Sequence, residues 1–356
     1  MLAFKYISYY YLKYFFIILM ALVAFLVGFD YMQNASDLSD SANLILIYLV
    51  YKSFYAVDML LPLSLVFAMI STKIFLIRSN ALVSFFSLGY TRIDILKPFL
   101  AVSTAIITIF ILLHSIPSFS RAYEFSNNIR KNAQYLSPTR DLFFIYKDKY
   151  VYFSKMLPLQ EKAEGIRVFS VENSSLREVL VASSAEYRDG YWVISKADII
   201  VKPQTIGFES LGIRVTELQD LKVLKGFRPK ILDQVYEGKV NFTIGDAIDA
   251  IVLLDEQNID TSNIRSALYK IFIYPFFVPL LVVIIFFFVP ISSRSINISI
   301  FSFGAILSTL MVWGVLFMLI ELSNNKTISS ELGVITPIIV LFFIALRQYK
   351  KYSITT

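Results

Sequence analysis

The chain has 356 residues, of which 56% are apolar, 16% aromatic and only 17% charged, and its formal net charge is +6. Soluble domains usually contain about 45–50% apolar and about 25% charged residues. This composition therefore excludes disorder, a nucleic-acid-binding arm and an ordinary cytosolic enzyme. The chain has no cysteine, which excludes disulfides, thiolate catalysis and cysteine-ligated metals. A membrane protein is the class that this composition favours.

Six stretches of the chain are long and apolar enough to cross a membrane as helices. A helix needs roughly 20 mostly apolar residues to span a hydrocarbon core of about 30 Å. The six predicted spans are residues 14–29, 59–77, 98–120, 271–291, 296–320 and 332–346. The single lysine in the second span, Lys73, lies near one end, where we expect it to reach the membrane surface.

Residues 121–265 separate the first three spans from the last three, and their composition is that of a soluble domain. The sequence therefore predicts an α-helical polytopic membrane protein with six transmembrane helices and a domain inserted between helices 3 and 4. The chain divides into residues 1–120, 121–265 and 266–356.

Basic residues near the predicted helix ends indicate the orientation. If the N-terminus is cytoplasmic, the inside segments contain ten basic residues and one acidic residue, and the short outside loops contain two basic and six acidic residues. Both termini are then cytoplasmic and the inserted domain lies outside. The alternative for the first span is a cleaved signal peptide with Ala35 and Ser36 beyond it, which would leave five helices. The charge of +6 is therefore a topology signal, and it gives little reason to expect capture of an anionic substrate by bulk positive charge.

The inserted domain has the pattern of an all-β fold. Short β-rich runs occur at residues 142–146, 150–153, 166–171, 179–182, 191–195 and 199–201. Asp189-Gly190 stands between two such runs and predicts a two-residue hairpin. Regular strands without helical patterns between them leave an antiparallel sandwich, a jelly roll or an open barrel as alternatives.

A helix is predicted after this β-rich region. Thr243 and Asp246 are spaced as a capping box. Apolar residues then recur at helical spacing at Ile244, Ala247, Ile248, Ile251 and Leu254. This amphipathic helix would lead the chain back to the membrane.

Residues for catalysis or nucleotide binding do not occur together in this sequence. The single histidine, His114, lies in the third span without an acidic neighbour in that span, so we interpret it as a hydrogen-bonded packing residue, with a functional site as the alternative. Gly238-Lys239 does not form a P-loop, because Asp233 occupies the position of the first glycine. Acidic relays typical of ion-coupled carriers are absent from the predicted spans. We therefore predict a non-catalytic protein without metal or cofactor, driven by a partner.

Residues 78–92, between the second and third spans, form a candidate docking element. The segment is apolar at Leu82, Phe85, Phe86 and Leu88, and Gly89 is a candidate C-cap. One interpretation is an amphipathic helix on the membrane surface. The other is a helix whose apolar face fills a groove on a cytoplasmic protein. The second interpretation predicts that Leu82→Asp and Phe85→Asp abolish binding of that protein.

A series of short motifs runs through nearly the whole chain. They are Leu61-Pro62-Leu63, Asn80-Ala81-Leu82, Gly89-Tyr90-Thr91-Arg92, Ala185-Glu186-Tyr187, Gly190-Tyr191-Trp192, Phe227-Arg228-Pro229, the apolar repeat of residues 244–254, Ala267-Leu268-Tyr269-Lys270 and Tyr274-Pro275. In this order and spacing the sequence resembles the LptF/LptG (YjgP/YjgQ) family of lipopolysaccharide export permeases. The ending Gly-Tyr-Thr-Arg is more similar to LptG than to LptF.

The resemblance implies a permease subunit of an ABC transporter in the bacterial inner membrane, with a periplasmic β-jellyroll-like domain. Its substrate would be lipopolysaccharide or lipooligosaccharide. Its partners would be the paralogous LptF or LptG subunit, an LptB ATPase dimer, and periplasmic LptC and LptA proteins, with no nucleic acid.

The resemblance also implies two sets of site residues. The residues that the resemblance implies in coupling to the ATPase are Ser79, Asn80, Ala81, Leu82, Phe85, Phe86, Gly89, Tyr90, Thr91 and Arg92. Candidates for a cavity for acyl chains are the aromatic residues Phe15, Phe16, Phe25 and Phe29 of the first span and Phe301, Phe303, Met311, Trp313 and Phe317 of the fifth, together with Lys52 for the anionic head group. Alternatively, these aromatic residues face lipid or neighbouring helices.

Two departures from the family pattern concern these sites. Ala81 stands where family members usually have a glutamate in the coupling helix, and residues 30–34 lack the lysines that LptG-type members carry near the outer end of the first helix. Two other functions remain as alternatives. One is a membrane sensor or envelope-assembly scaffold with a ligand-binding β domain, and the other is a transporter of lipoproteins or peptides.

Overall fold

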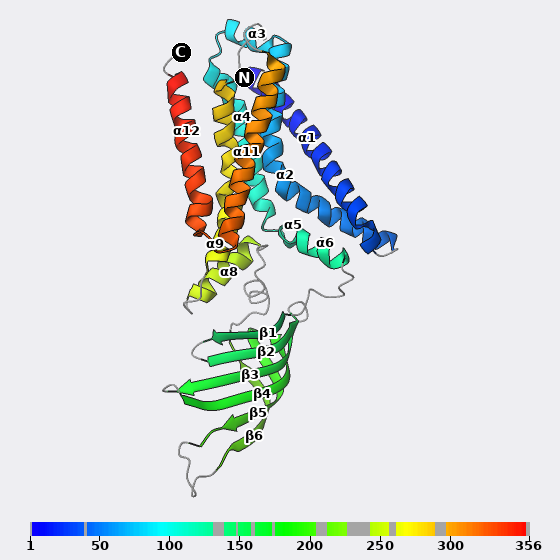
Figure 1. Cartoon of the computed structure of the whole chain (residues 1–356), viewed down its shortest axis with the longest axis vertical. Coiled ribbons are helices and arrows are strands. Elements are labelled where there is room, and N and C mark those ends of the chain that lie inside the picture. Colours follow the sequence, from blue (N-terminus) through cyan, green and yellow to red (C-terminus); the bar gives the residue numbers. More distant parts are fainter. Residues whose placement is uncertain are drawn as a thin grey trace. The chain divides into compact units, whose positions relative to one another are not determined.

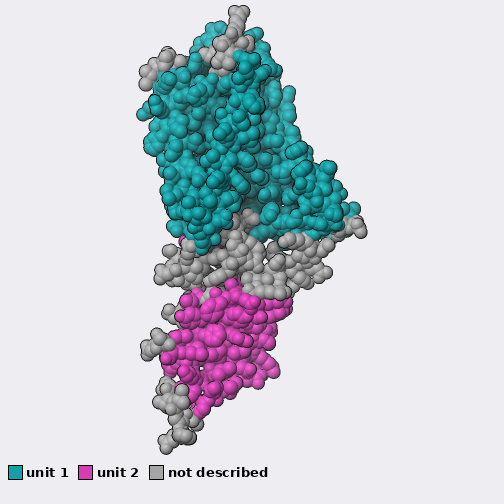
Figure 2. Space-filling view, in the orientation of Figure 1, with its two compact units in different colours: residues 1–130, 243–245, 262–356 teal, residues 131–242, 246–261 magenta. Residues whose placement is uncertain are grey.

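The computed structural model divides the chain into two compact units, shown in different colours in Figure 2. Unit 1 comprises residues 1–130, 243–245 and 262–356, and unit 2 comprises residues 131–242 and 246–261. The structure describes residues 2–38, 41–130, 139–146, 149–157, 161–172, 175–203, 212–225, 243–255, 261–288 and 297–353. The motif Phe227-Arg228-Pro229, Asp233 and the pair Gly238-Lys239 lie outside these residues.

Unit 1 is helical (Figure 1). Its elements are α1 (Leu2–Asn34), η1 (Ala35–Asp37), α2 (Ala42–Arg78), α3 (Ala81–Ser87), α4 (Arg92–Leu113), α5 (Pro117–Ser120), α6 (Ala122–Arg130), α9 (Ser262–Phe272), η2 (Tyr274–Phe276), α10 (Phe277–Phe288), α11 (Ile298–Asn324), η3 (Glu331–Ile335) and α12 (Thr336–Ser353). Among the described residues, six helical stretches are long and apolar enough to cross a membrane. The fourth runs from α9 through η2 to α10, and the sixth joins η3 to α12. The prediction of six spans is confirmed.

The second span, α2, is the most deeply buried of the six. In its most apolar stretch of 18 residues, 72% is buried. It packs against α1, α6, α10 and α11. On α1 the buried residues recur at every fourth position, from Ala3 through Ile7 and Tyr11 to Val27. A single ridge of this spacing is typical of helix packing along one line of contact. The opposite face of α1 is exposed, including Phe16, Phe25 and Phe29.

Two helix boundaries differ from the sequence prediction. Helix α2 begins at Ala42, so Lys52 and Asp58, which we expected in a loop, are helical. Both are paired with residues of other helices, and these partners offset part of the cost of burying a charge in a well-packed helix. Helix α4 begins at Arg92 and ends at Leu113, three residues before Ile116, whose backbone is extended ahead of Pro117.

Unit 2 contains one six-stranded antiparallel sheet among its described residues. The strands are β1 (Thr139–Tyr146), β2 (Lys149–Leu157), β3 (Lys162–Glu172), β4 (Ser175–Arg188), β5 (Tyr191–Val201) and β6 (Arg214–Val223). They pair in chain order, β1 to β6 (Figure 1). The expected insertion of an all-β domain between the third and fourth spans is confirmed. Helix α8 (Ile244–Asp255) follows, as predicted, although Ile248 is exposed.

The predicted hairpin joins β4 to β5. Asp189 and Gly190 have φ values of 50° and 82°, and Arg188 pairs with Tyr191 directly beside them. Two successive residues with positive φ match the right-handed twist of a hairpin. Next to this turn Glu186 forms ion pairs with Lys162 and Arg188, and these two cations hold the pKa of the Glu186 carboxyl below its usual value.

The sheet is interrupted along one line that crosses its strands. Pairing is skipped between Asp141 and Ser154, between Ser154 and Gly165, and between Gly165 and Ser183. The gap continues between β4 and β5 and reaches Asp220 of β6. Asp141, Gly165 and Asp220 have φ values of 52°, 63° and 53°. Interruptions at the same level in neighbouring strands bend the whole sheet, and Figure 1 shows the strands curving.

Candidate functional site

Helix α3 lies at the end of unit 1 that also carries the N- and C-termini (Figure 1). It has seven residues, Ala81–Ser87, and is therefore shorter than the three turns that residues 78–92 predicted. Asn80 at its start has φ 55° and Gly89 beyond its end has φ 85°. These two left-handed residues set the short helix off from α2 and α4.

A capping box begins α4 directly after this segment. The Thr91 hydroxyl accepts a hydrogen bond from the Asp94 backbone N–H at 3.2 Å, and the Thr91 N–H donates to the Asp94 carboxylate at 3.1 Å. This reciprocal pair fixes the direction in which the chain enters α4. Arg92 then lies over the Tyr352 ring, with 5.6 Å from its guanidinium carbon to the ring centroid. Four of the predicted coupling residues, 89–92, therefore form a structured turn.

The apolar residues of α3 face two directions. Leu82 is 1% exposed and belongs to the core of unit 1. Phe85 is half-buried and contacts the rings of Tyr6 and Tyr90, with centroid distances of 6.0 and 5.9 Å. In contrast, Val83 is 43% exposed and Leu88 is 74% exposed. The accessible apolar surface of this segment is thus formed by Val83 and Leu88, and Leu82 anchors the helix to its own unit.

Lys73 of α2 is buried within unit 1, whereas the sequence predicted that its side chain would extend outward to the membrane surface. Its side chain is buried, its ammonium donates a hydrogen bond to the Phe286 carbonyl, and it lies 3.6 Å from the centroid of the Phe286 ring. Phe286 is in the last turn of α10, where backbone carbonyls have no partner within the helix. Lys73 therefore caps α10, and the Phe286 carbonyl takes the place of the membrane-surface contact that the sequence pattern predicted.

Most of the predicted cavity residues lie on the outside of unit 1. Phe25, Phe29, Phe303, Met311 and Phe317 are all exposed. Phe301 and Trp313 are partly buried against the core, and Trp313 stacks on Phe317 with a centroid distance of 5.8 Å. Of the further aromatic candidates, Phe16 is exposed and Phe15 is buried against the other helices. Most of the set is therefore free to contact lipid, a substrate or another subunit.

Lys52 is held by the end of α1. Its ammonium lies 2.7 Å from a carboxylate oxygen of Asp30, and the other oxygen of Asp30 accepts a hydrogen bond from the Tyr48 hydroxyl. The Lys52 side chain is only 9% exposed. Because Asp30 already neutralises its charge, Lys52 binds an anionic head group only if this ion pair opens.

The neighbouring helix α6 joins the same end of α1. Arg130 donates a hydrogen bond to the side-chain oxygen of Asn34 at 2.8 Å, and Asn34 donates to the Asp30 carbonyl at 2.8 Å. The residues of 30–34 that depart from the family pattern thus tie α1 to α2 and α6. We call Asp30, Asn34, Tyr48, Lys52 and Arg130 the outer clasp.

His114 has an acidic partner that its own helix did not reveal. Its Nε2 lies 3.0 Å from Oδ1 of Asp58 on α2, and its Nδ1 lies 3.0 Å from the carbonyl oxygen of Phe110. The pattern of the third span alone did not predict this pair, because its two partners are 56 residues apart in the chain. The one available signal was Asp58, an acidic residue between two apolar stretches.

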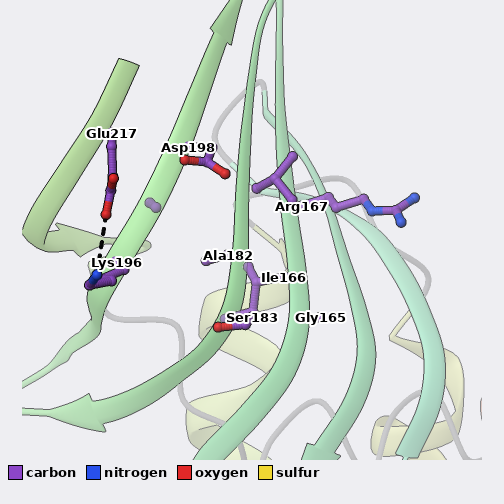
Figure 3. A pocket seen from close by; sticks show the side chains of 10 residues that line it. Gly165, Ile166, Arg167, Ala182, Ser183, Lys196, Asp198 and Glu217 are labelled. Carbon is purple, nitrogen blue, oxygen red and sulfur yellow. Dashed lines mark ion pairs between the residues drawn. The ribbon is translucent and has the colours of Figure 1, made fainter. Parts of the chain in front are cut away.

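A cavity of about 550 Å³ opens on unit 2 over strands β3 to β6. Charged side chains line it, and Figure 3 shows Lys196 paired with Glu217 at 3.4 Å, with Asp198 beside them and Arg167 pointing away. The rest of the lining is apolar or small and includes Ile166, Val181 and Ala182. Among the described residues, no group of three or more His, Cys, Asp or Glu side chains is placed to hold a metal ion.

Comparison with known families covers almost the entire chain. The model of the lipopolysaccharide export system permease LptF/LptG matches residues 5–351. The chain belongs to the LptF/LptG family. A search of curated proteins finds no match.

Membership in the LptF/LptG family accounts for the architecture described above. The protein is a multi-pass inner-membrane protein and a permease of lipopolysaccharide export. Ala81 of the α3 segment is partly buried and packs against the core of unit 1. In the outer clasp, the end of α1 presents a paired acid, Asp30, and no free charge of that residue is left for a ligand.

Proposed function

We propose that this chain is the permease subunit of an ABC transporter that extracts lipopolysaccharide or lipooligosaccharide from the inner membrane. A separate LptB-type ATPase dimer drives it, and the substrate passes to a periplasmic bridge toward the outer membrane. The observation that carries this proposal is α3, a short helix at the same end as both termini that leaves Val83 and Leu88 uncovered. An apolar pair on an exposed helix fits a groove on a partner protein.

The exposed faces of α1 and α11 support a second subunit. In each of these helices, only 17% of the most apolar stretch of 18 residues is buried within this chain. A paralogous LptF- or LptG-type subunit, of which this chain is the LptG-like member, would face them and enclose a cavity for acyl chains. Phe25, Phe29, Phe303, Met311 and Phe317 are then wall residues of that cavity.

The edges of the sheet in unit 2 support a bridge built by strand addition. Among the described residues β1 and β6 each pair on one side only, and Val215 and Leu218 on β6 and Phe143 and Ile145 on β1 are exposed. A free edge is a template for a further strand. In this proposal LptC- and LptA-type jellyroll proteins supply that strand, with unit 2 in the periplasm and the termini in the cytoplasm.

The ATPase contact is tested by Leu88→Asp. A charge placed in an apolar groove costs binding energy without affecting the fold of unit 1, because Leu88 is 74% exposed. We expect the amount of ATPase that copurifies with the chain to fall by at least about tenfold, as for loss of an anchor residue. The matched control is Ile213→Asp, an equally apolar and exposed residue of unit 2, which should leave the ATPase bound.

Leu82→Asp distinguishes docking from folding. Leu82 is buried in the core of unit 1, so its variant should lower the melting temperature of the chain as well as ATPase binding. Retention of the ATPase by both Leu88→Asp and Val83→Asp would contradict the docking role of α3.

If the unmodified chain associates with no ATPase, the sensor or scaffold function replaces the permease. Mass spectrometry of the lipids bound to the purified complex tests the substrate, since bound lipoprotein or peptide would contradict lipopolysaccharide.

A further inference from the structure

His114 occupies the point where the chain leaves the third span. It is the C-cap of α4, its side chain is 9% exposed, and its ring makes edge-to-face contacts with Phe110 and Phe119 at centroid distances of 4.8 and 5.1 Å. Its backbone carbonyl accepts a hydrogen bond from the Ile244 N–H at 3.4 Å. The residue therefore contacts α2, α5 and the first residue of α8.

Both ring nitrogens of His114 face hydrogen-bond acceptors. The Phe110 carbonyl opposite Nδ1 has no hydrogen to donate, and the Asp58 carboxyl opposite Nε2 has none when it is ionised. A neutral imidazole carries only one N–H, so one of the two 3.0 Å contacts would place two lone pairs against each other. An imidazolium carries two N–H groups and satisfies both contacts.

We propose that His114 and Asp58 form a proton-binding site in which the His114 imidazole is doubly protonated in the folded protein at neutral pH. The ligand is a proton, and the site holds it between α2 and the end of α4. The proton resides on the imidazole because imidazoles are ordinarily stronger bases than carboxylates by roughly two and a half pH units. Proton binding then stabilises the junction at which the chain leaves the membrane unit and Ile244 returns to it.

The charges around the pair support this distribution of the proton. The end of α4 carries the partial negative charge of a helix C-terminus, which favours a cation at its C-cap. Lys270 of α9 also interacts electrostatically with Asp58 and contributes a positive charge on the far side of that carboxyl. Among the described residues, the phenols of Tyr55 on α2 and Tyr274 on η2 also interact with Asp58. Helix α5, whose Phe119 contacts the His114 ring, carries no ionisable side chain, and the buried Arg121 follows it in the chain.

The chain has one histidine, so the site can be observed directly. The full chain is produced with ¹⁵N-histidine and a tag free of histidine, placed in lipid nanodiscs, and its ring nitrogen shifts are recorded by solid-state NMR. At about pH 7.5 a free imidazole is only about a tenth protonated. We expect His114 to be more than half protonated at that pH, with both nitrogens in the imidazolium range. A neutral imidazole with one bare nitrogen would overturn the proposal, and this measurement needs no variant.

Asp58→Asn is the matched variant. An asparagine amide can donate to Nε2, so a neutral imidazole with its hydrogen on Nδ1 then satisfies both contacts. We expect His114 in this variant to become mostly neutral at about pH 7.5. An imidazolium that persists in Asp58→Asn would contradict the role of Asp58.

Thermal stability gives an independent measure of the same proton. If the folded chain binds one more proton than the unfolded chain, its stability falls as the pH rises. The melting temperature of the unmodified chain should therefore drop more than that of Asp58→Asn when the pH is raised from about 6 to about 8.5, across the range in which free histidine titrates. Equal drops in the two proteins would contradict proton binding by the pair.

Discussion

The outer clasp illustrates how single residues decide whether a charge is available for binding. Lys52 and Asp30 are both mostly buried, and each is the other's counter-ion at 2.7 Å. Removing one member of such a pair leaves an uncompensated charge, and this costs far more than removing both. The clasp should therefore behave as a structural element whatever the substrate is.

The test at this scale is Lys52→Met, which keeps the length of the side chain and removes its charge. We expect the free energy of unfolding of unit 1 to fall on the order of 3 kcal/mol, because Asp30 loses its cation. The double variant Lys52→Met with Asp30→Asn should recover part of this loss, measured by thermal unfolding in the same lipid or detergent. A single variant as stable as the parent chain would contradict the structural role of the ion pair.

At the scale of elements, the bend of the sheet depends on Gly165. Its φ is 63°, and a Cβ added there would lie 2.6 Å from the Cβ of Ser154 on the neighbouring strand. Gly165→Ala should therefore destabilise unit 2 by about 1–3 kcal/mol, the usual cost of a strained backbone position. Gly190→Ala is the matched control, because Gly190 has φ 82° but open space around it.

The two variants separate strain from collision. Both place alanine at a positive φ, so the difference between their unfolding free energies measures the clash with Ser154 alone. Adding Ser154→Gly to Gly165→Ala should remove that difference and leave the cost of the backbone. An equal effect of Gly165→Ala and Gly190→Ala would mean that the sheet accommodates the extra carbon at its bend.

The sequence predicted the elements better than their ends. All six spans and the β4–β5 hairpin could be predicted, because hydropathy over 20 residues and an Asp-Gly turn are local signals. The first half of α2 was missed, since Lys52 and Asp58 read as loop residues when their partners, Asp30 and His114, lie on other helices. The bend of the sheet was missed for a related reason, because it consists of skipped pairings between strands.

The candidate site was predicted in the same uneven way. The sequence located the α3 segment and its apolar composition, but amphipathic spacing did not tell Leu82, which is buried, from Leu88, which is exposed. The difference arises from packing against the core of unit 1, a contact that no local pattern encodes. The His114 pair depends on a contact of the same kind.

At the scale of the whole molecule, the chain places one tryptophan in each unit. Trp192 is fully buried in the sheet of unit 2, and Trp313 lies on α11 of unit 1. The chain has no other tryptophan, so Trp313→Phe and Trp192→Phe leave one fluorescent reporter per unit. We expect Lys52→Met to lower the unfolding transition seen by Trp313 and to leave that seen by Trp192 unchanged, and Gly165→Ala to do the reverse. Transitions that always shift together would show that the two units unfold cooperatively.

The order of the strands also bears on how the protein is made. Each of β2 to β6 pairs with the strand just before it in the chain, so the described sheet needs no residue from α9 onward. Contacts between neighbours in sequence form quickly. During synthesis the sheet can therefore form before the last three spans are made. The last three spans must then pack against α2 and α4 when the insert between them is already folded. This packing is therefore the late step in the formation of unit 1.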